Sequence, residues 1–261
     1  MSMVALQALR WRIVLASLDA AISSRAAISL TMLGVFFAQA LPSTVGTDIV
    51  RVWSVRRFGI SLGTATNSVI VDRLVGLLAL LTLGTLSVPY LLGLAAGGAA
   101  AFAMAGITLA GAGACVVLLG LRRLPQSWTR WAPLRGLTSL SRAFWAVFFS
   151  MRVFLQAFGL SLTTQLGVIS VTYLLGVSMD VGVGLGSYLA IMPPVLLVSS
   201  LPISIAGWGV REGTMIVGLG FVGVPADAAL AISLLLGGVV VASGLAGAAF
   251  WALERRLPGA V

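Results

Sequence analysis

The stretch LPSTVGTDIVR, residues 41–51, follows an apolar run and brings a proline, a glycine, an aspartate and an arginine close together. A second stretch, LPISIAGWGVR at residues 201–211, has the same length and matches the first without a gap at Leu, Pro, Val and Arg. Apolar segments that Gly or Pro interrupts at corresponding places in two halves of a chain are typical of inverted-repeat transporters. The two stretches therefore predict two broken or re-entrant helices in an inverted repeat, with breaks at Pro42, Gly46, Pro202, Gly207 and Gly209.

Coincidence is the alternative explanation of the two stretches. Pro133 and Arg142 have the same spacing as the proline and arginine of each stretch, but they lack the flanking matches. Leucine and valine matches also carry little weight in so apolar a chain. A true internal repeat and a chance match therefore both stay open at the level of sequence.

The composition indicates a membrane protein. The chain has 261 residues, a mean hydropathy of +1.10 and only 9% charged side chains, against roughly 25% in soluble domains. One crossing of a hydrocarbon core about 30 Å thick needs about 20 mostly apolar residues, so about six or seven crossings fit. We expect an all-α integral membrane protein, a polytopic helical bundle that occupies residues 1–261 as one transmembrane domain.

Apolar segments and arginine-rich segments alternate along the chain. By the positive-inside rule, arginine-rich loops lie in the cytoplasm. We therefore expect a multi-pass protein of the inner (plasma) membrane, with its arginine-rich loops and its C-terminus on the cytoplasmic side. The apolar segments that cross or enter the membrane are predicted at residues 28–46, 74–94, 99–121, 152–177, 183–200 and 228–252.

Two segments next to the predicted spans carry arginines. Residues 122–142 contain five arginines with two tryptophans between them, which favours a basic cytoplasmic loop with indoles at the level of the headgroups. In residues 1–27, arginines and Asp19 interrupt the apolar residues before a signal-peptide core can form. We interpret residues 1–27 as an amphipathic, interfacial N-terminus. A helix left over from a longer chain is the alternative.

Residue counts exclude several kinds of chemistry. The chain has no histidine and one cysteine, Cys115, so a Ser-His-Asp triad, a histidine-bound metal and a disulfide framework are impossible. All 16 basic residues are arginine, and the phosphate-binding loop of nucleotide hydrolases needs a lysine. The net charge of +9 fits anionic lipids better than nucleic acid, because no soluble domain is expected to present a nucleic-acid surface. We expect no cofactor, no metal and no nucleic-acid partner.

Three charge pairs in or near the apolar segments are candidate site residues. A broken helix exposes N–H groups and a dipole end that favour an anion, and arginine binds phosphate through two parallel hydrogen bonds. We therefore expect a groove between the two repeats that binds a lipid headgroup. The alternatives are that the arginines only reach the headgroups and fix the topology, or that the pairs are purely structural. The candidate pairs are Asp48 with Arg51, Asp72 with Arg73, and Arg211 with Glu212.

The chain resembles a flippase-like family that includes the transmembrane region of lysylphosphatidylglycerol synthase. The motifs that carry the resemblance are Arg10-Trp11, LPSTVGTDIVR, SVIVDRLVGL at 68–77 and LPISIAGWGVREG at 201–213, so it extends over nearly the whole chain.

The chain departs from the family pattern in two ways. Where the family often has Pro-Gly and Gly-Asp, this chain has Pro42-Ser43 and Thr47-Asp48. The aspartate is therefore kept, while a glycine that would let the backbone approach a headgroup is missing. Family members usually begin with one or two further hydrophobic helices before the Arg-Trp motif. The resemblance thus implies that this chain is short at its N-terminus.

The resemblance implies translocation of a phospholipid or a lipid-linked sugar between leaflets. Because these residues do not contain the soluble aminoacyl-transferring domain of the synthase, it also implies transport without lipid synthesis, and we expect no enzymatic activity. Three alternatives stay open: a membrane-embedded transferase, an accessory subunit that serves an enzyme of lipid or cell-envelope glycan synthesis, and a plain membrane scaffold. Convergence of Arg51, Arg73 and Arg211 on one polar groove would favour transport over a scaffold.

Overall fold

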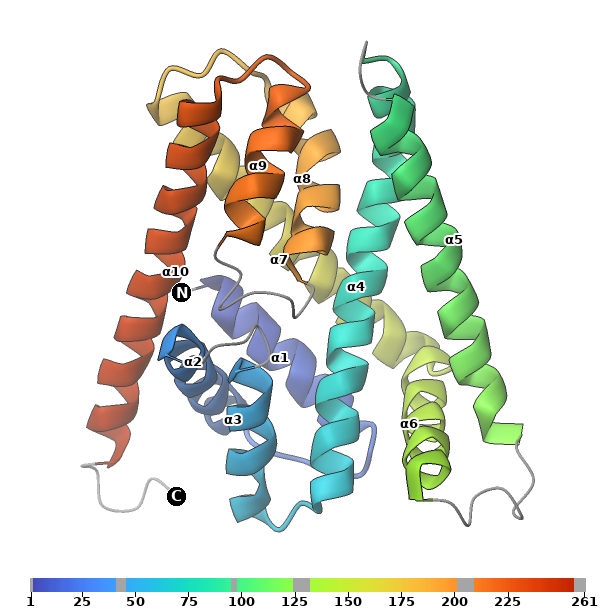
Figure 1. Cartoon of the computed structure of the whole chain (residues 1–261). Coiled ribbons are helices and arrows are strands. Elements are labelled where there is room, and N and C mark those ends of the chain that lie inside the picture. Colours follow the sequence, from blue (N-terminus) through green and yellow to red (C-terminus); the bar gives the residue numbers. More distant parts are fainter. Residues whose placement is uncertain (1, 41–45, 95–97, 124–131, 201–208, 256–261) are drawn as a thin grey trace.

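Helices make up most of the chain that the computed structural model describes, which comprises residues 2–40, 46–94, 98–123, 132–200 and 209–255 (Figure 1). No strand occurs in these ranges, so the predicted all-α fold is confirmed. In chain order the elements are α1 (Ser2–Ala16), α2 (Ser24–Ala40), α3 (Gly46–Val55), η1 (Arg56–Phe58), α4 (Leu62–Leu92), α5 (Gly98–Gly120), η2 (Leu121–Arg123), α6 (Ala132–Phe148), α7 (Met151–Ser178), α8 (Leu185–Ser199), α9 (Val210–Gly220) and α10 (Ala226–Arg255).

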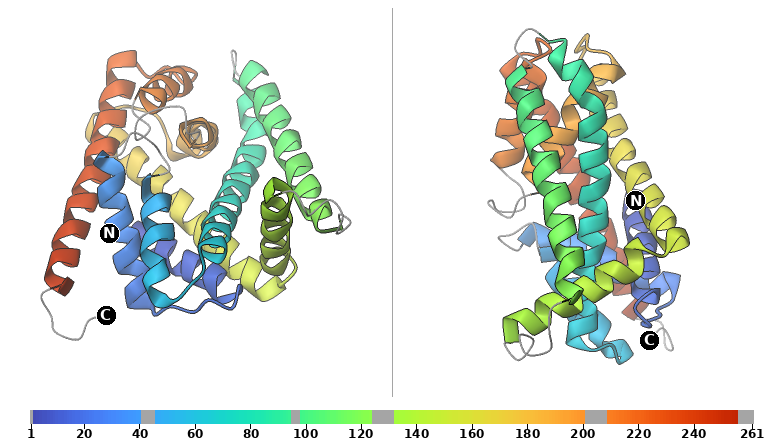
Figure 2. Two further views of the ribbon diagram at one scale, coloured as in Figure 1. Left: turned by 60° about the horizontal axis from the view of Figure 1, so that its bottom comes forward. Right: turned by 90° about the vertical axis from the view of Figure 1, so that its right-hand side faces the viewer.

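Four of the described helices, α4, α5, α7 and α10, are apolar and long enough to cross a membrane. α4 and α5 pack together as an antiparallel hairpin along one side of the molecule, α7 runs obliquely through it, and α10 lies on the opposite side (Figures 1 and 2). α5 has few buried residues, whereas nearly half of the apolar part of α4 is buried. α4 is therefore the long helix whose residues contribute most to the interior.

α4 begins at Leu62, well before the span predicted at residues 74–94. Ser61 caps the helix, since its Oγ accepts a hydrogen bond from the Thr64 backbone N–H at 3.1 Å. The first turns of α4 carry polar side chains, and because of these side chains the hydropathy pattern did not predict the turns as part of a membrane span. Ser68 and Asp72 are fully buried in these turns, so they face protein partners rather than water.

Two pairs of short helices enter the molecule from opposite ends (Figure 1). In the pair α2–α3, one helix ends at Ala40 and the next begins at Gly46; in the pair α8–α9, the corresponding residues are Ser199 and Val210. In both pairs these ends face the middle of the molecule. A helix thus ends and another begins around each of the two opening stretches, as predicted.

The predicted break residues are only partly described. Gly46 is the first residue of α3, and Gly209 precedes α9 with a φ of 85°, a conformation that glycine adopts without strain. Pro42, Pro202 and Gly207 lie outside the described residues. The inverted repeat itself stays a prediction.

The N-terminal segment differs from the expected interfacial helix. Residues 1–27 contain α1 and the start of α2, and α1 packs against α2, α4 and α7. Trp11 and Leu15 of α1 are fully buried. α1 is therefore part of the packed interior, because its apolar residues surround the helix rather than forming one stripe.

The basic segment at residues 122–142 also differs from the expected loop. Its second half, from Ala132, is the start of α6, and its first residues belong to η2. Residues 124–131 lie outside the described part of the chain. α6 packs against α4 and α5, with Phe144 fully buried, so Arg135 and Arg142 belong to a helix that is anchored in the bundle.

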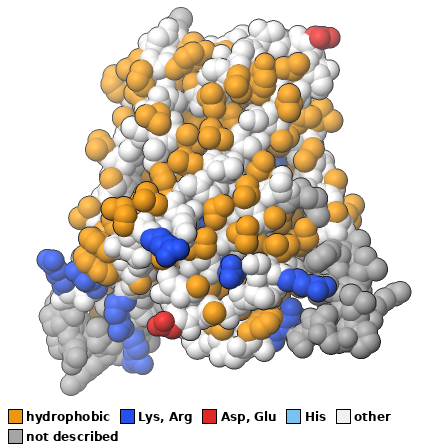
Figure 3. Space-filling view, turned by 180° about the vertical axis from the view of Figure 1, so that it is seen from behind, with side chains coloured by type: hydrophobic (Ala, Val, Ile, Leu, Met, Phe, Trp, Pro, Cys, Tyr) orange, Lys and Arg blue, Asp and Glu red, His pale blue; other side chains and the backbone are white. Residues whose placement is uncertain are grey.

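The arginine-rich segments lie at one end of the molecule. η1, η2 and the C-terminal end of α10 are together at the lower end in Figure 1. The space-filling view from behind shows arginine side chains gathered over the lower part and hydrophobic side chains above them (Figure 3). The prediction that the arginine-rich loops and the C-terminus share the cytoplasmic side of the membrane stays a prediction.

A close contact joins the two helices of the first short pair. A Cβ on Gly34 of α2 would lie 2.9 Å from both Cγ2 and the carbonyl oxygen of Thr47 in α3. Gly34→Ala is expected to force α3 away from α2 and to destabilise the protein by about 1–3 kcal/mol. Melting of the purified protein in detergent, followed by tryptophan fluorescence, measures the loss.

The control for this prediction is Gly106→Ala in α5, where no described atom lies within 4 Å of the added Cβ. That change is expected to be neutral or to stabilise by up to about 1 kcal/mol, because alanine favours a helix. Equal melting temperatures for the two variants would show that α2 and α3 do not approach each other this closely.

Candidate functional site

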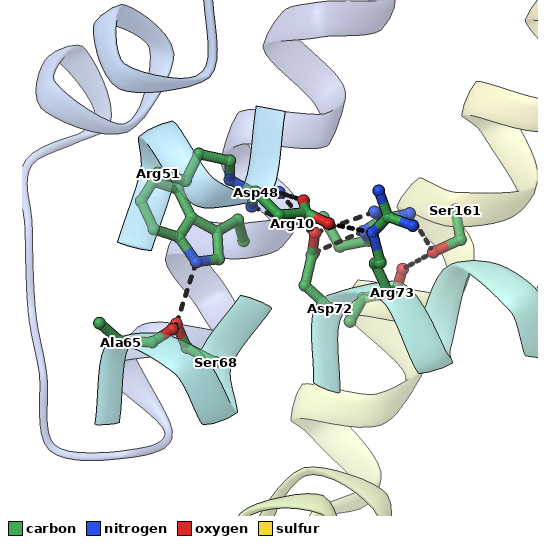
Figure 4. Close-up of polar contacts among 10 residues, drawn as sticks. Arg10, Asp48, Arg51, Ala65, Ser68, Asp72, Arg73 and Ser161 are labelled. Atoms are coloured by element: carbon green, nitrogen blue, oxygen red, sulfur yellow. Dashed lines mark hydrogen bonds and ion pairs between the residues drawn. The ribbon is translucent and has the colours of Figure 1, made fainter. Parts of the chain in front are cut away.

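Asp72 of α4 is the centre of a buried cluster of charged side chains (Figure 4). Arg10 of α1 binds both of its carboxylate oxygens, through Nε at 2.7 Å and Nη2 at 3.1 Å. Arg51 of α3 donates from both Nη atoms to Oδ2 of the same carboxylate, each at 3.1 Å. All three side chains are buried, Asp72 and Arg51 almost completely. One carboxylate thus joins three helices that are distant in sequence.

Asp48 is the second carboxylate of the cluster. It lies one turn before Arg51 in α3, with its Oδ1 3.7 Å from Arg51 Nη1, and its Oδ2 contacts Arg73 of α4. The Arg73 side chain is 35% exposed, which makes it the most accessible cation of the cluster. Three arginines and two aspartates leave one net positive charge. In a site with little water such a charge favours an anion.

Neutral side chains fix the two buried arginines. Arg51 stacks on the ring of Trp11, with Cζ 4.1 Å from the ring centroid, and Trp11 Nε1 donates to Ser68 Oγ at 3.1 Å. Arg10 donates from Nη1 to Ser161 Oγ of α7 at 3.0 Å. Arg51 Nε has no hydrogen-bond partner among the described residues. The cluster is therefore held rigidly, while one buried N–H of Arg51 is left unused.

The cluster lies beside a cavity of about 600 Å³. α1, α3 and α4 supply its charged wall, α7 supplies Thr164 and Gln165, and the end of α8 supplies the wall that includes Ser199 and Ser200. The predicted residues Asp48, Arg51, Asp72 and Arg73 thus line one cavity. Its lining residues are Gln7, Arg10, Thr47, Asp48, Arg51, Asp72, Arg73, Gly76, Leu77, Leu80, Ile107, Thr164, Gln165, Leu197, Val198, Ser199 and Ser200.

Arg211 and Glu212 are not among the residues that line this cavity. Arg211 Nη2 lies 2.8 Å from Glu212 Oε1, and Glu212 accepts hydrogen bonds from the Gly209 backbone N–H and from Ser233 Oγ of α10. A carboxylate at the first turn of a helix satisfies free N–H groups and the helix dipole. The expected convergence of Arg211 with Arg51 and Arg73 is therefore not observed, because this pair begins α9 and joins it to α10.

Asp72 and Arg73 also differ from the expected pair. They are neighbours in α4, but Asp72 binds Arg10 and Arg51, while Arg73 turns to Asp48. Arg10 is the site residue that the sequence analysis did not include. Arg10 lies 62 residues before Asp72, so sequence spacing could not indicate that the two side chains are in contact. The Arg10-Trp11 motif was the feature of the sequence that could have indicated Arg10 as a site residue.

No group of three side chains that could ligate a metal occurs in the described part of the chain. The charged side chains of the cluster interact through ion pairs and hydrogen bonds. Arginines with fixed positions and one net positive charge can bind a phosphate or carboxylate through parallel N–H groups. The aspartates neutralise the arginines when no anion is present, which limits the cost of holding them in a low-dielectric site.

Comparison with known families finds one that matches nearly the whole chain. The family described as "Lysylphosphatidylglycerol synthase TM region" matches residues 1–252. The chain belongs to this family. No curated protein and no solved structure matches it. As a member of this membrane-domain family with four helices able to span a bilayer, the chain is an integral, multi-pass membrane protein.

In this family member, loss of the central carboxylate is expected to destabilise the fold. Asp72→Asn leaves Arg10 and Arg51 buried without their counter-ion, so the free energy of unfolding should fall by about 3–5 kcal/mol. The matched control is Asp180→Asn at an exposed turn, since asparagine tolerates the φ of 54° found there. Thermal melting in detergent compares the two; equal melting temperatures would contradict a structural role for the cluster.

Proposed function

We propose that the protein moves a lipid with an anionic headgroup, a phospholipid or a lipid-linked sugar phosphate, between the two leaflets of the membrane. The observation that carries the proposal is a cavity inside a mostly apolar helical molecule, one wall of which is a cluster of three arginines and two aspartates with one net positive charge. A charge buried at such a cost is usually functional. Membership in a family named for the membrane region of a lipid synthase supports the choice of a lipid.

The contacts suggest how an anion enters the cavity. Arg73 is the most accessible cation of the cluster, and it forms an ion pair with Asp48. A phosphate that replaces Asp48 gains two charge-assisted hydrogen bonds from Arg73. Arg10 and Arg51 stay fixed on Asp72. The headgroup thus competes with Asp48, and Asp48 in turn helps to release it.

The two pairs of short helices supply the path in this proposal. Their ends meet near the cavity from opposite sides of the molecule (Figure 1). If α2–α3 and α8–α9 act as the two repeats, small movements of each pair open the cavity to one leaflet at a time. We place the protein in the plasma membrane with its arginine-rich end on the cytoplasmic side, the orientation that the positive-inside rule favours.

Transport fits the site better than catalysis. Both carboxylates of the cavity, Asp48 and Asp72, form ion pairs with arginines, so neither can act as a general base without first breaking an ion pair. An enzyme of lipid or glycan synthesis would then be a partner that supplies the lipid. Neither an accessory subunit nor a scaffold requires lipid movement, so a measurement of lipid movement between leaflets distinguishes these functions from transport.

Replacing the accessible cation is expected to slow transport. Fluorescent phosphatidylglycerol, phosphatidylcholine and a lipid-linked sugar are followed between leaflets in liposomes that contain the protein. Arg73→Gln should slow movement of the anionic lipids by about tenfold or more, the effect of losing about 1.4 kcal/mol of binding. The same substitution leaves Arg10 and Arg51 on Asp72, so the fold should be kept.

Arg57→Gln is the control for this variant. Arg57 is an exposed arginine of η1 and does not line the cavity. It is expected to transport within about twofold of the wild-type rate, as surface substitutions change energies by about 0.5 kcal/mol or less. No lipid movement by the wild-type protein, or equal slowing by both variants, would favour the accessory or scaffold function.

Removing the competing carboxylate is expected to tighten anion binding. Asp48→Asn raises the net charge of the cluster by one and removes the ion pair between Asp48 and Arg73. Inorganic phosphate or glycerol 3-phosphate should then bind about tenfold more tightly, a gain of about 1.4 kcal/mol. Isothermal titration with the protein in detergent gives the affinity, with Asp227→Asn, at an exposed position outside the cavity, as the control. Unchanged or weaker binding in Asp48→Asn would contradict competition between Asp48 and the anion.

A further inference from the structure

A second hollow, almost wholly apolar, lies between α8 and α9. Its volume is about 480 Å³. The hydroxyl among its lining side chains, on Thr214, is already satisfied, since Oγ1 donates to the Val210 carbonyl oxygen at 2.8 Å. We call this hollow the apolar groove; its lining residues are Leu91, Ile191, Pro194, Val195, Val198, Gly209, Val210, Gly213, Thr214, Val217, Gly218 and Phe221.

The apolar groove follows α9 over most of the length of this helix. It extends from Gly209 to Phe221, which is about 18 Å at 1.5 Å per residue. Its lining is almost wholly apolar over this length, as a hydrocarbon chain requires.

The apolar groove opens outward and borders the charged cavity. Val217 on its rim is 62% exposed, so the rim faces the surroundings of the molecule. Val198 of α8 lines both the apolar groove and the charged cavity. The two hollows are therefore neighbours, as the charged end and the apolar end of one lipid require.

We propose that the apolar groove binds a hydrocarbon chain of the lipid whose anionic headgroup occupies the charged cavity. Burial of a chain against these side chains gains free energy in proportion to the apolar area removed from other contacts, and Thr214, the one described lining residue with a polar side chain, already has a hydrogen-bond partner. The identity of the headgroup rests on the proposed function; the chain site rests on the groove itself. The substrate class is then an anionic lipid with at least one long chain, rather than a water-soluble phosphate.

Gly213 provides a way to fill the groove without disturbing the packing. It lies on the groove-lining face of α9, and no described atom is within 4 Å of a Cβ built on it. Gly220, at the end of the same helix, has equally open surroundings but does not line the groove. Gly213→Leu and Gly220→Leu therefore form a matched pair. Val217→Phe fills the groove from its rim and serves as a second variant should Gly213→Leu fold poorly.

The experiment uses phosphatidylglycerol with a photoreactive diazirine at the end of one acyl chain, incorporated with the full-length protein into nanodiscs. After illumination, mass spectrometry maps the labelled residues. We expect labels concentrated on residues 191–198 and 209–221, reduced about tenfold in Gly213→Leu or Val217→Phe and unchanged in Gly220→Leu. Labels spread evenly over the outward residues of α5 and α10, or equal labelling in all variants, would overturn the proposal.

The result does not depend on lipid transport, because labelling reports where a chain binds. Labels in the groove that Gly213→Leu removes would support the chain site even if the wild-type protein moved no lipid in liposomes, in which case only the proposed transport fails. Lipid movement by the wild-type protein with no labels in the groove, and with Gly213→Leu as active as wild type, would refute the chain site and leave transport intact.

Discussion

The rest of the structure depends on the ion pairs that the carboxylate of Asp72 forms with Arg10 and Arg51. The carboxylate is fully buried in a long apolar helix, where an isolated charge is costly, and it is stable there because two guanidinium groups bind it. Arg10 brings α1 to α4, and Arg51 brings α3 to α4. α2 packs against α3 and is therefore positioned with it. α7 contacts Arg10 through the hydrogen bond that Arg10 donates to Ser161. The position of the cavity is a consequence of this arrangement.

The cavity is asymmetric in its chemistry. α1, α3 and α4 supply the charges. The end of α8 supplies short polar and apolar residues such as Ser199 and Val198, and α9 turns its own charged pair toward α10. The arginines that end the two opening stretches therefore have different surroundings. Arg51 lines the cavity, whereas Arg211 pairs with Glu212 at the start of α9.

Much of the fold followed from the sequence because its causes are local. Long apolar runs predicted α5, α7, α8 and α10 to within a few residues, and the Pro- and Gly-containing stretches predicted where two helices are interrupted. Asp48 and Arg51 share a helix face, so their contact also followed from spacing. The errors arose from contacts between distant segments. α4 began earlier than predicted because polar residues in its first turns are paired inside the protein, and Arg10 was missed because its partner is far along the chain.

The order of these charges along the chain has a consequence for the assembly of the protein in the membrane. Arg10 and Arg51 both precede Asp72, so the two cations are synthesised before the anion emerges. A lone aspartate at the centre of a spanning helix disfavours insertion by roughly 2.5–3.5 kcal/mol. With α1 and α3 already made, α4 can enter the bilayer next to its counter-ions instead of alone. A buried triad that stabilises the finished fold can in this way also assist the insertion of its central helix.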